Sequence, residues 1–390
     1  MLQLTPQELR AKKAIHTATE ICQQPQVWKE LIQKLSDKRE LWREFLEPVL
    51  KKHEQVRVIF TGAGTSAFAG DLLVPHLRKQ NRRNMLFESI PTTDIVSNPK
   101  EFFVKGIPTI LVSLARSGNS PESVAAVSLG RKWIDHFYQV VITCNKEGQL
   151  ARNARKDEKS IVFLMPEKSH DLGFAMTSSF TAMVLAAGIL FAEKPIDSRH
   201  LEKIITIAKQ WIDRIPPLVD EILQFDFRRI VYLGSGLLGQ LSHEAALKML
   251  ELTAGNVVAV HESSLGFRHG PKSVLNSQSL VVLFMSQQAY TSKYDLDMLR
   301  ELARDESGAK VAVLSEKVDE EIKGLAEWMI PVHVDYDAVG DDFFLALLYV
   351  IFAQTLALKK SLQLGITPDN PSPDGRVNRV VKGVTIHPYP

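Results

Sequence analysis

The chain has 390 residues, a net charge of +2 and 45% apolar residues, values that exclude a mostly disordered, collagen-like or coiled-coil protein. At about 100–200 residues per domain, this length predicts two or three domains. The small net charge gives no broad electrostatic surface for nucleic acid or anionic lipid, so we expect neither as a partner. The two cysteines, Cys22 and Cys144, form neither a disulfide framework nor a zinc-type cluster, and we expect no metal site.

Region 1–53 is predicted to be helical, because apolar residues recur there at helical spacing among charged ones. These residues are Leu31, Leu35, Leu41, Phe45 and Leu50. The first twenty residues lack the apolar run of a signal peptide. The longest apolar stretch, 343–358, contains Tyr349 and Gln354 and is too short to span a bilayer comfortably. We interpret it as a buried helix and expect a cytoplasmic protein that does not enter a membrane.

Short apolar runs alternate with helical segments through the rest of the chain. In the first half they cover 56–61, 108–114, 139–144 and 160–165, and in the second half they begin at Ile230, Ser279, Lys310 and Trp328. Runs without period-two alternation indicate strands that are covered on both faces. Because helices separate them, they predict parallel sheets in a three-layer α/β sandwich.

The two series of strands indicate a duplicated domain. The glycine turn at Gly62 recurs at Gly234, 172 residues later, and Val140 recurs as Val311, 171 residues later. A near-constant offset over several elements is typical of tandem repeats. The predicted boundaries are a helical segment at 1–53, a first domain at 54–200 and a second domain at 201–390. The linker is predicted to be a helix that ends at Pro216 and Pro217.

Ligands of open parallel sheets bind at the carboxyl ends of the strands, and polar residues gather in the loops there. After the first strand, Gly64, Thr65 and Ser66 offer close backbone approach, hydroxyls and free N–H groups to an anion. The third glycine and the acidic residue of a dinucleotide fingerprint are not convincingly placed. The competing interpretation is a glycine turn with a Ser/Thr helix cap.

A second loop, Arg116-Ser117-Gly118-Asn119-Ser120, precedes a helix and has the composition of a phosphate-binding turn. Its N–H groups and two hydroxyls suit phosphate oxygens, and the helix dipole favours the negative charge. A capping box with Ser120 as the cap is the competing interpretation, and the two are compatible. A third hydroxyl cluster around Thr177 is more often just a helix cap.

Two further motifs carry acid/base groups. Lys248 and Glu251 are three residues apart on one helix face, where such a pair is usually a solvated salt bridge. The apolar residues around Glu251 favour a partly desolvated carboxylate, which a general base needs. His269 stands beside Gly270 and Pro271 in an unusual turn that presents its ring, although a lone histidine is usually structural or on the surface.

Taken together, these motifs resemble the sugar isomerase (SIS) family from about residue 56 to the C-terminus. The matching segments are Gly64–Ser66 with the family's GTS loop, Arg116–Ser120 with its phosphate loop, Ala246–Glu251 with its ALKLKE helix, Arg268–Pro271 with its KHGP loop and Asn378–Thr385 with its lysine-bearing tail. The last match places Lys382 on the family's active-site lysine. The resemblance implies two tandem SIS domains, each a three-layer αβα sandwich around a mostly parallel five-stranded sheet.

The arrangement is similar to the isomerase half of glucosamine-6-phosphate synthase, and the whole chain resembles the AgaS subfamily. This resemblance implies a deaminating isomerase that converts D-galactosamine 6-phosphate to tagatose 6-phosphate and ammonia without a cofactor. Two alternatives keep an enzyme: an aldose–ketose isomerase that does not deaminate, or a fructosamine-6-phosphate deglycase. A third is a non-catalytic sensor of a phosphosugar.

The resemblance also implies roles for the site residues. Ser117 and Ser120, helped by Thr65 or Ser66, would bind phosphate, His269 would open the sugar ring and Glu251 would move a proton from carbon 2 to carbon 1. Lys248 and Lys382 would stabilise the developing oxyanion or orient the open chain. In the synthase the histidine comes from the neighbouring subunit, so a homodimer or larger assembly is expected, with His269 completing the partner's site.

Two departures from the synthase pattern stand out. Ala115 and Arg116 replace a serine and a glutamine of its phosphate loop, and we expect Arg116 to add positive charge there. No glutaminase domain precedes the repeated pair, so we expect the reaction to run with free ammonia, in the deaminating direction.

Overall fold

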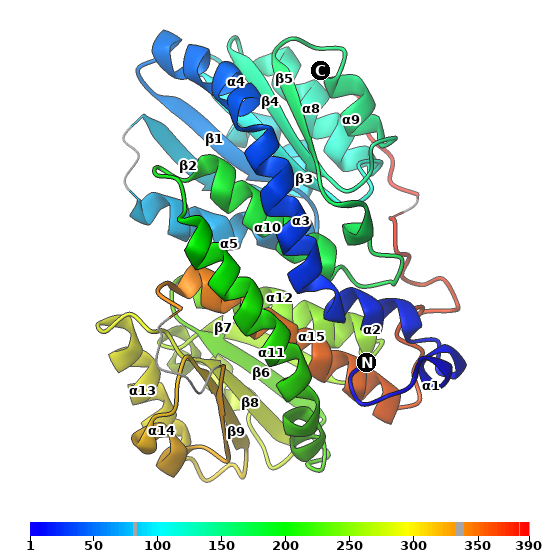
Figure 1. Cartoon of the computed structure of the whole chain (residues 1–390), viewed down its shortest axis with the longest axis vertical. Helices are drawn as coiled ribbons and strands as arrows, with labels where there is room; N and C mark the ends of the chain where they lie inside the picture. Colours follow the sequence, from blue (N-terminus) through cyan, green and yellow to red (C-terminus); the bar gives the residue numbers. More distant parts are fainter. Residues whose placement is uncertain (81–83, 333–338, 382, 390) are drawn as a thin grey trace. The chain divides into compact units, whose positions relative to one another are not determined.

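The computed structural model describes residues 1–80, 84–332, 339–381 and 383–389 (Figure 1). The chain forms two compact units. Unit 1 contains Met1–Pro25, Leu172–Ala175 and Ser198–Asp374, and unit 2 contains Gln26–Asp171, Met176–Asp197 and Gly375–Pro390. Among the described residues, each unit has one five-stranded sheet in which every pairing is parallel.

The sheet of unit 2 has the strand order β2-β1-β3-β4-β5. Its strands are β1 (Val56–Thr61), β2 (Met85–Ser89), β3 (Thr109–Ala115), β4 (Phe137–Thr143) and β5 (Ser160–Leu164). The helices of this unit are α3 (Gln24–Asp37, which starts in the last residues of unit 1's first segment), α4 (Arg39–Lys52), α5 (Thr65–Lys79), α6 (Thr92–Ser97), α7 (Pro99–Phe102), α8 (Pro121–Trp133), α9 (Gln149–Ala154), η1 (Glu167–Ser169) and α10 (Ser178–Phe191).

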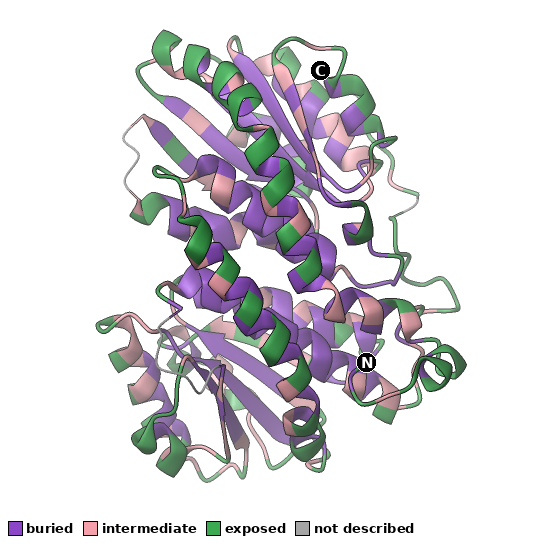
Figure 2. Ribbon diagram, in the orientation of Figure 1, coloured by how far each residue is buried: buried purple, intermediate pink, exposed green. Residues whose placement is uncertain are grey.

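Helices cover both faces of this sheet, because alternate strand residues point to opposite faces. Ile59 and Leu111 belong to an apolar cluster with residues of α6, α8 and α9. The next residue of β1, Phe60, points the other way and packs edge-on against Phe191 of α10, with 5.3 Å between the ring centroids. Figure 2 shows the central strands β3 and β4 as buried along their lengths. The predicted three-layer sandwich is confirmed.

The sheet of unit 1 has the order β10-β9-β8-β6-β7. Its strands are β6 (Arg229–Gly234), β7 (Val258–Ser263), β8 (Ser279–Phe284), β9 (Lys310–Ser315) and β10 (Trp328–Pro331). Its helices are α1 (Pro6–Ala11), α2 (Ile15–Cys22), α11 (Ser198–Ile222), α12 (Leu237–Leu252), η2 (Gly266–Arg268), η3 (Pro271–Val274), α13 (Thr291–Leu302), α14 (Glu320–Leu325) and α15 (Asp342–Gln363). Read from β7, this order repeats that of unit 2 strand for strand, as expected of a duplication.

Two strands lie outside the apolar runs that predicted the others, and they occupy the same place in the two sheets. Both β2 and β7 are edge strands beside the first strand of their sheet. Their sequences, MLFES and VAVHES, end in charged and polar residues, and every residue of β7 is exposed or half-buried. An edge strand with an exposed face does not need the apolar residues that mark a central one.

The predicted end of the linker helix at Pro216 and Pro217 is wrong. Helix α11 continues through both prolines to Ile222. Each proline removes one backbone hydrogen bond, but Ile215, Pro216 and Val219 are buried on one face of the helix. This apolar burial outweighs the lost hydrogen bonds, because helices in proteins are stabilised mainly by packing.

The long apolar stretch in the second half is α15. By length and composition this helix is apolar enough to cross a membrane, but 94% of its most apolar window is buried inside the protein. Tyr349 lies on it and donates a hydrogen bond to the carbonyl of Met285, at 3.0 Å. The helix therefore has the surroundings of a core helix, as its sequence predicted.

Part of the predicted N-terminal helical segment belongs to the core of unit 2. Trp42 of α4 packs edge-on against Phe163 of β5 and Phe191 of α10, with ring centroids 5.8 and 5.1 Å away. Its indole N–H donates to the carbonyl of Leu190 at 2.8 Å. Helix α4 thus covers the sheet through one large aromatic contact.

We expect Trp42→Ala to lower the free energy of unfolding by about 3–5 kcal/mol, the usual cost of deleting a buried aromatic side chain. Urea denaturation followed by circular dichroism measures it. Leu41→Ala is the matched control, since Leu41 is 47% exposed, and it should change stability by less than about 0.5 kcal/mol. Equal effects of the two substitutions would contradict a core role for α4.

Candidate active-site loops and acid/base groups

The first predicted loop forms the turn between β1 and α5. A Cβ on Gly62 would lie 2.5 Å from the Cβ of Ser66, so only glycine fits there. Gly64 has φ +54° and is the N-cap of α5, and no side chain caps the helix at this position. Thr65 and Ser66 are the first two helical residues, and both are buried. The Ser/Thr cap that competed with an anion site is therefore not present in this turn.

The second predicted loop joins β3 to α8. Ser120 is the N-cap, and its hydroxyl accepts from the N–H of Ser123 at 3.4 Å. Gly118 has φ +65°, and the amide of Asn145 donates to the carbonyl of Ser117 at 2.9 Å. Ser117 and Ser120 remain half-buried. The cap predicted from the sequence exists, and the loop presents two hydroxyls at the N-terminus of a 13-residue helix, where the dipole favours an anion.

Arg116 of this loop is turned toward the C-terminal segment of the chain. Its side chain is buried, and its guanidinium donates to the carbonyl of Arg379 at 2.8 Å. Arg379 in turn donates to the carbonyl of Asp171. That Arg116 also adds charge for phosphate remains a prediction.

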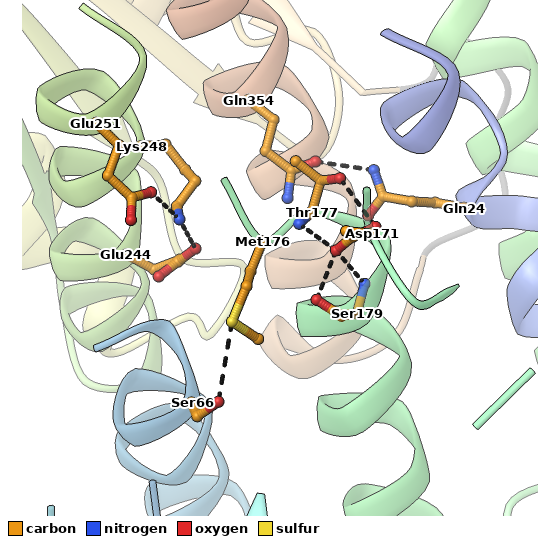
Figure 3. A network of polar contacts seen from close by, with 10 residues as sticks. All are labelled: Gln24, Ser66, Asp171, Met176, Thr177, Ser179, Glu244, Lys248, Glu251 and Gln354. Carbon is orange, nitrogen blue, oxygen red and sulfur yellow. Dashed lines mark hydrogen bonds and ion pairs between the residues drawn. The ribbon is translucent and has the colours of Figure 1, made fainter. Parts of the chain in front are cut away.

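The third loop is organised by Asp171 (Figure 3). The carboxylate of Asp171 accepts from the N–H groups of Thr177 and Ser179 at 2.8 and 2.9 Å, and from the hydroxyls of Ser178 and Ser179. Thr177 is fully buried. The loop is therefore a helix cap in which an aspartate fills the place of an anion. A substrate contact by Thr177 remains a prediction.

The duplicated turn in unit 1 has kept its backbone but not the two hydroxyls that come after the glycine. Gly236 has φ +56° and is the N-cap of α12, as Gly64 is of α5. Leu237 and Leu238 come after it, where Thr65 and Ser66 come after Gly64.

The counterpart of the phosphate loop in unit 1 is filled by carboxylates of the protein. After β8, the N–H of Ser286 donates to Asp295 at 3.0 Å and the N–H of Gln287 donates to Asp342 at 3.0 Å. Burial raises the pKa of Asp295, while hydrogen bonds from Ser235, Ser264 and Ser286 oppose this shift. Of the two corresponding loops, after β3 in unit 2 and after β8 in unit 1, the loop in unit 2 has the composition of a phosphate site.

The predicted acid/base pair lies on α12 of unit 1 (Figure 3). Lys248 is fully buried and forms ion pairs with Glu251 and with Glu244, the latter at 3.4 Å. Burial lowers the pKa of Lys248, but the carboxylates of Glu244 and Glu251 outweigh it and raise the pKa above its ordinary value. Lys248 is therefore an ammonium at neutral pH. The side chain of Glu251 is 23% exposed, so a carboxylate oxygen can reach a ligand from solvent.

The other two predicted catalytic residues stand apart from this pair. His269 comes directly after η2 in an exposed position, next to Gly270 with φ +119°. Within the described part of the chain, no hydrogen bond or ion pair involves its ring. Lys382 lies outside the described residues.

Comparison with known proteins decides the family. The SIS domain matches residues 52–193 and again residues 225–361, so each of the two parallel sheets lies in one match. The chain belongs to the SIS domain family. Its two SIS domains explain the duplicated strand order and the repeated glycine turns.

The SIS domain pair has similar relatives over nearly its full length. The D-galactosamine-6-phosphate deaminase AgaS of Shewanella sp. (strain ANA-3) is 42% identical, and the alignment covers 100% of this chain and 96% of that protein. A proposed tagatose-6-phosphate ketose/aldose isomerase from Clostridium novyi has a solved structure with a TM-score of 0.96 at 41% identity, covering 100% of this chain and 99% of that one. The tagatose-6-phosphate ketose/aldose isomerase of Escherichia coli has a TM-score of 0.87 at 38% identity, covering 96% of each chain.

The sequence alone did not assign roles to three carboxylates: Asp171, Glu244 and Asp295. A signal existed for Glu244, which is four residues before Lys248 and so shares its helix face. Asp171 lies six residues before Thr177 and Asp295 lies nine residues after Ser286, which are spacings that no standard cap has. Only the fold brings these two carboxylates to helix and loop N–H groups.

We expect Asp171→Ala to lower the free energy of unfolding by about 3 kcal/mol, because it leaves buried N–H groups of the α10 cap without an acceptor. Urea denaturation measures the loss. Asp135→Ala, at an exposed position, is the control and should cost less than about 0.5 kcal/mol. A loss for Asp171→Ala no larger than that of the control would contradict the capping role.

A pH dependence of stability arises from His243 of α12, whose ring stacks on that of His261 with 3.9 Å between the centroids. Burial, and next the neighbouring His261, lower the pKa of His243 to about 4. The unfolded chain, with a histidine pKa near 6.5, binds the extra proton first as pH falls. This contribution is therefore complete above about pH 6.5 and is lost as the pH falls toward 4.

Since His243 is only about half-buried, solvent screening reduces its contribution to about 1 kcal/mol. We expect His243→Gln to remove that part of the stability loss between pH 6.5 and 4, measured by urea denaturation at each pH. His16→Gln is the control, because His16 is exposed. The same pH profile for His243→Gln and for the unaltered protein would contradict this assignment.

Proposed function

We propose that the protein is a deaminating isomerase that converts D-galactosamine 6-phosphate to tagatose 6-phosphate and ammonia. The observation that carries the proposal is the 42% identity, over all of this chain, to a D-galactosamine-6-phosphate deaminase. The geometry supports it in two places. Unit 2 offers hydroxyls at the N-terminus of α8, and unit 1 holds a buried ammonium next to a partly exposed carboxylate.

In this proposal the phosphate of the substrate binds at the β3–α8 loop. Ser117 and Ser120 donate their hydroxyl protons to the phosphate oxygens, and the first N–H groups of α8 add the favourable end of the helix dipole. Thr65 and Ser66 assist from the start of α5. The phosphate stays unreacted, so its binding energy serves to orient the rest of the sugar.

The chemical steps are transfers of protons followed by addition of water. His269 moves a proton from the anomeric hydroxyl to the ring oxygen, which opens the ring to an aldehyde. Glu251 takes the proton from carbon 2, which gives an enolamine once the carbon 1 oxygen has gained a proton. Glu251 then returns its proton to carbon 1 while the nitrogen loses one proton to solvent, which leaves a hydroxyl on carbon 1 and an imine at carbon 2. Lys248, with Lys382, stabilises the negative charge that develops on the carbon 1 oxygen. Water then adds to the imine, and ammonia leaves as the ketone forms.

We further propose that the enzyme is cytoplasmic and at least dimeric. His269 is exposed, beside a glycine with φ +119°. That position suits a histidine that completes the site of a second subunit, as the sequence resemblance implied.

An aldose–ketose isomerase without deamination is the second candidate. Two relatives with solved structures, at 41% and 38% identity, carry the name tagatose-6-phosphate ketose/aldose isomerase. For the relative at 41% identity, that name is itself a proposed one. The same base and phosphate loop would serve that reaction, because it also moves a proton between carbon 2 and carbon 1.

The deciding measurement is ammonium release from a panel of hexosamine 6-phosphates, run beside interconversion of tagatose 6-phosphate and galactose 6-phosphate. We expect ammonium from galactosamine 6-phosphate. Sugar interconversion without ammonium would replace the proposal by the second candidate. Turnover of neither would contradict both.

We expect Glu251→Gln to lower kcat by about 10²–10⁴-fold, since it removes the general base. Binding of tagatose 6-phosphate, followed by calorimetry, should persist and shows that the variant is folded. Glu320→Gln is the matched control, because Glu320 is exposed on α14, and it should keep full turnover. Normal turnover in Glu251→Gln would remove that residue from the mechanism.

A further inference from the structure

The C-terminal segment of the chain lies in unit 2, and its described residues, 375–381 and 383–389, form neither helix nor strand. Of the side chains described between 376 and 389, only Val384 and Tyr389 are partly buried, and the others are exposed. Such a segment has little apolar burial to hold it in place. Its position must therefore come from a few specific contacts.

One set of contacts lies near the start of the segment. The carbonyl of Arg379 accepts from the guanidinium of Arg116 at 2.8 Å. The guanidinium of Arg379 donates to the carbonyl of Asp171. This inner anchor ties the segment to the phosphate loop and to the residue that caps α10.

A second set lies at Tyr389. The Tyr389 ring packs edge-on against Trp133 at the end of α8, with 5.5 Å between the centroids. The ammonium of Lys100 lies 5.3 Å from the Trp133 ring and 5.8 Å from the Tyr389 ring. Lys132 donates to the carbonyl of Tyr389 at 3.0 Å. This outer anchor combines an aromatic pair, a cation shared by both rings and a hydrogen bond. Figure 1 shows the C-terminus beside α8 and α9.

The chain between the anchors is not packed against the helix beneath it. A cavity of about 510 Å³ opens there, lined by Ile386 and His387 of the segment and by Asn119, Pro121 and Val124 of the phosphate loop and α8. The sides of Ile386 and His387 that face this cavity have no atoms of the described residues packed against them. The inner anchor alone would leave the described residues 383–388 without a second fixed point, so the outer anchor limits the conformations they can adopt.

We propose that Tyr389 is a positioning residue, which fixes the C-terminal segment beside the phosphate loop. Lys382, to which the proposed mechanism gives a role, lies in sequence between the two anchors and outside the described residues. A segment held at both anchors should therefore support turnover better than a segment held at the inner anchor alone. This kinetic consequence rests on the proposed function. The anchoring itself does not.

The test compares Tyr389→Ala with the unaltered protein in limited trypsin digestion, with mass spectrometry to identify cleavage after Arg376, Arg379 or Lys382. Loss of the aromatic pair and the cation–π contact should speed cleavage there by about 10-fold. The apparent affinity for inorganic phosphate and kcat/KM for galactosamine 6-phosphate should each fall by about 10-fold, because the docked segment becomes a minority state. The melting temperature should stay the same, since no core contact is lost.

Three further variants make the result specific. Tyr389→Phe keeps the ring and should behave like the unaltered protein. Lys100→Gln removes the shared cation and should give a smaller effect of about 3-fold. Tyr290→Ala is the matched control, because Tyr290 is 71% exposed and pairs with Tyr294 in unit 1, and it should change neither cleavage nor kinetics.

Unchanged cleavage in Tyr389→Ala overturns the proposal. Faster cleavage with unchanged phosphate affinity and unchanged kcat/KM also overturns it, since the anchor would then hold the segment without positioning anything. If the unaltered protein turns over no sugar, the proposed function fails by itself. Cleavage then decides the anchor: it must become faster in Tyr389→Ala, and not in Tyr290→Ala, for the anchor to stand.

Discussion

The constraint on which both units depend is the set of unsatisfied N–H groups where a helix comes after a parallel strand. The first N–H groups of a helix have no partner within it, and each parallel sheet brings several such helices to one edge. In two of these connections between a strand and a helix the protein meets this need with negative charge. Asp171 accepts from the start of α10, and Asp295 and Asp342 accept from the loop after β8. At the start of α8, Ser120 provides only a hydroxyl cap.

The duplicated sheets show how one architecture can carry two roles. Both keep a glycine with positive φ after the first strand, because the backbone of that turn admits little else. The next two residues differ between the repeats: a threonine and a serine in one, and two leucines in the other. In the second repeat the helix instead carries Lys248 between two carboxylates. The repeats thus diverged in side chains while the strand order was kept.

Much of the fold, and part of the candidate site, could be predicted from the sequence, because buried parallel strands and tight glycine turns leave strong local patterns. The central strands and the Ser120 cap belong to that class. The edge strands β2 and β7 do not, since exposure relaxes their composition. Likewise Asp171 could not be assigned as a cap, because its partners are six to eight residues away and only the folded loop brings them together. Pairing of Lys248 with Glu251 was predictable from helical spacing. The complete burial of Lys248 was not, because it results from packing of the folded unit.

The path of the chain between the two units has a consequence for dissection of the protein. The chain passes from one unit to the other after Pro25, Asp171, Ala175, Asp197 and Asp374. A single cut therefore cannot yield two complete fragments: removing the first 53 residues takes Trp42 and α4 from one sheet, and ending at residue 200 omits the C-terminal segment. Each unit is assembled from three segments that are far apart in the sequence and are therefore synthesised at different times. During synthesis, unit 2 stays incomplete until residues 375–390 have left the ribosome.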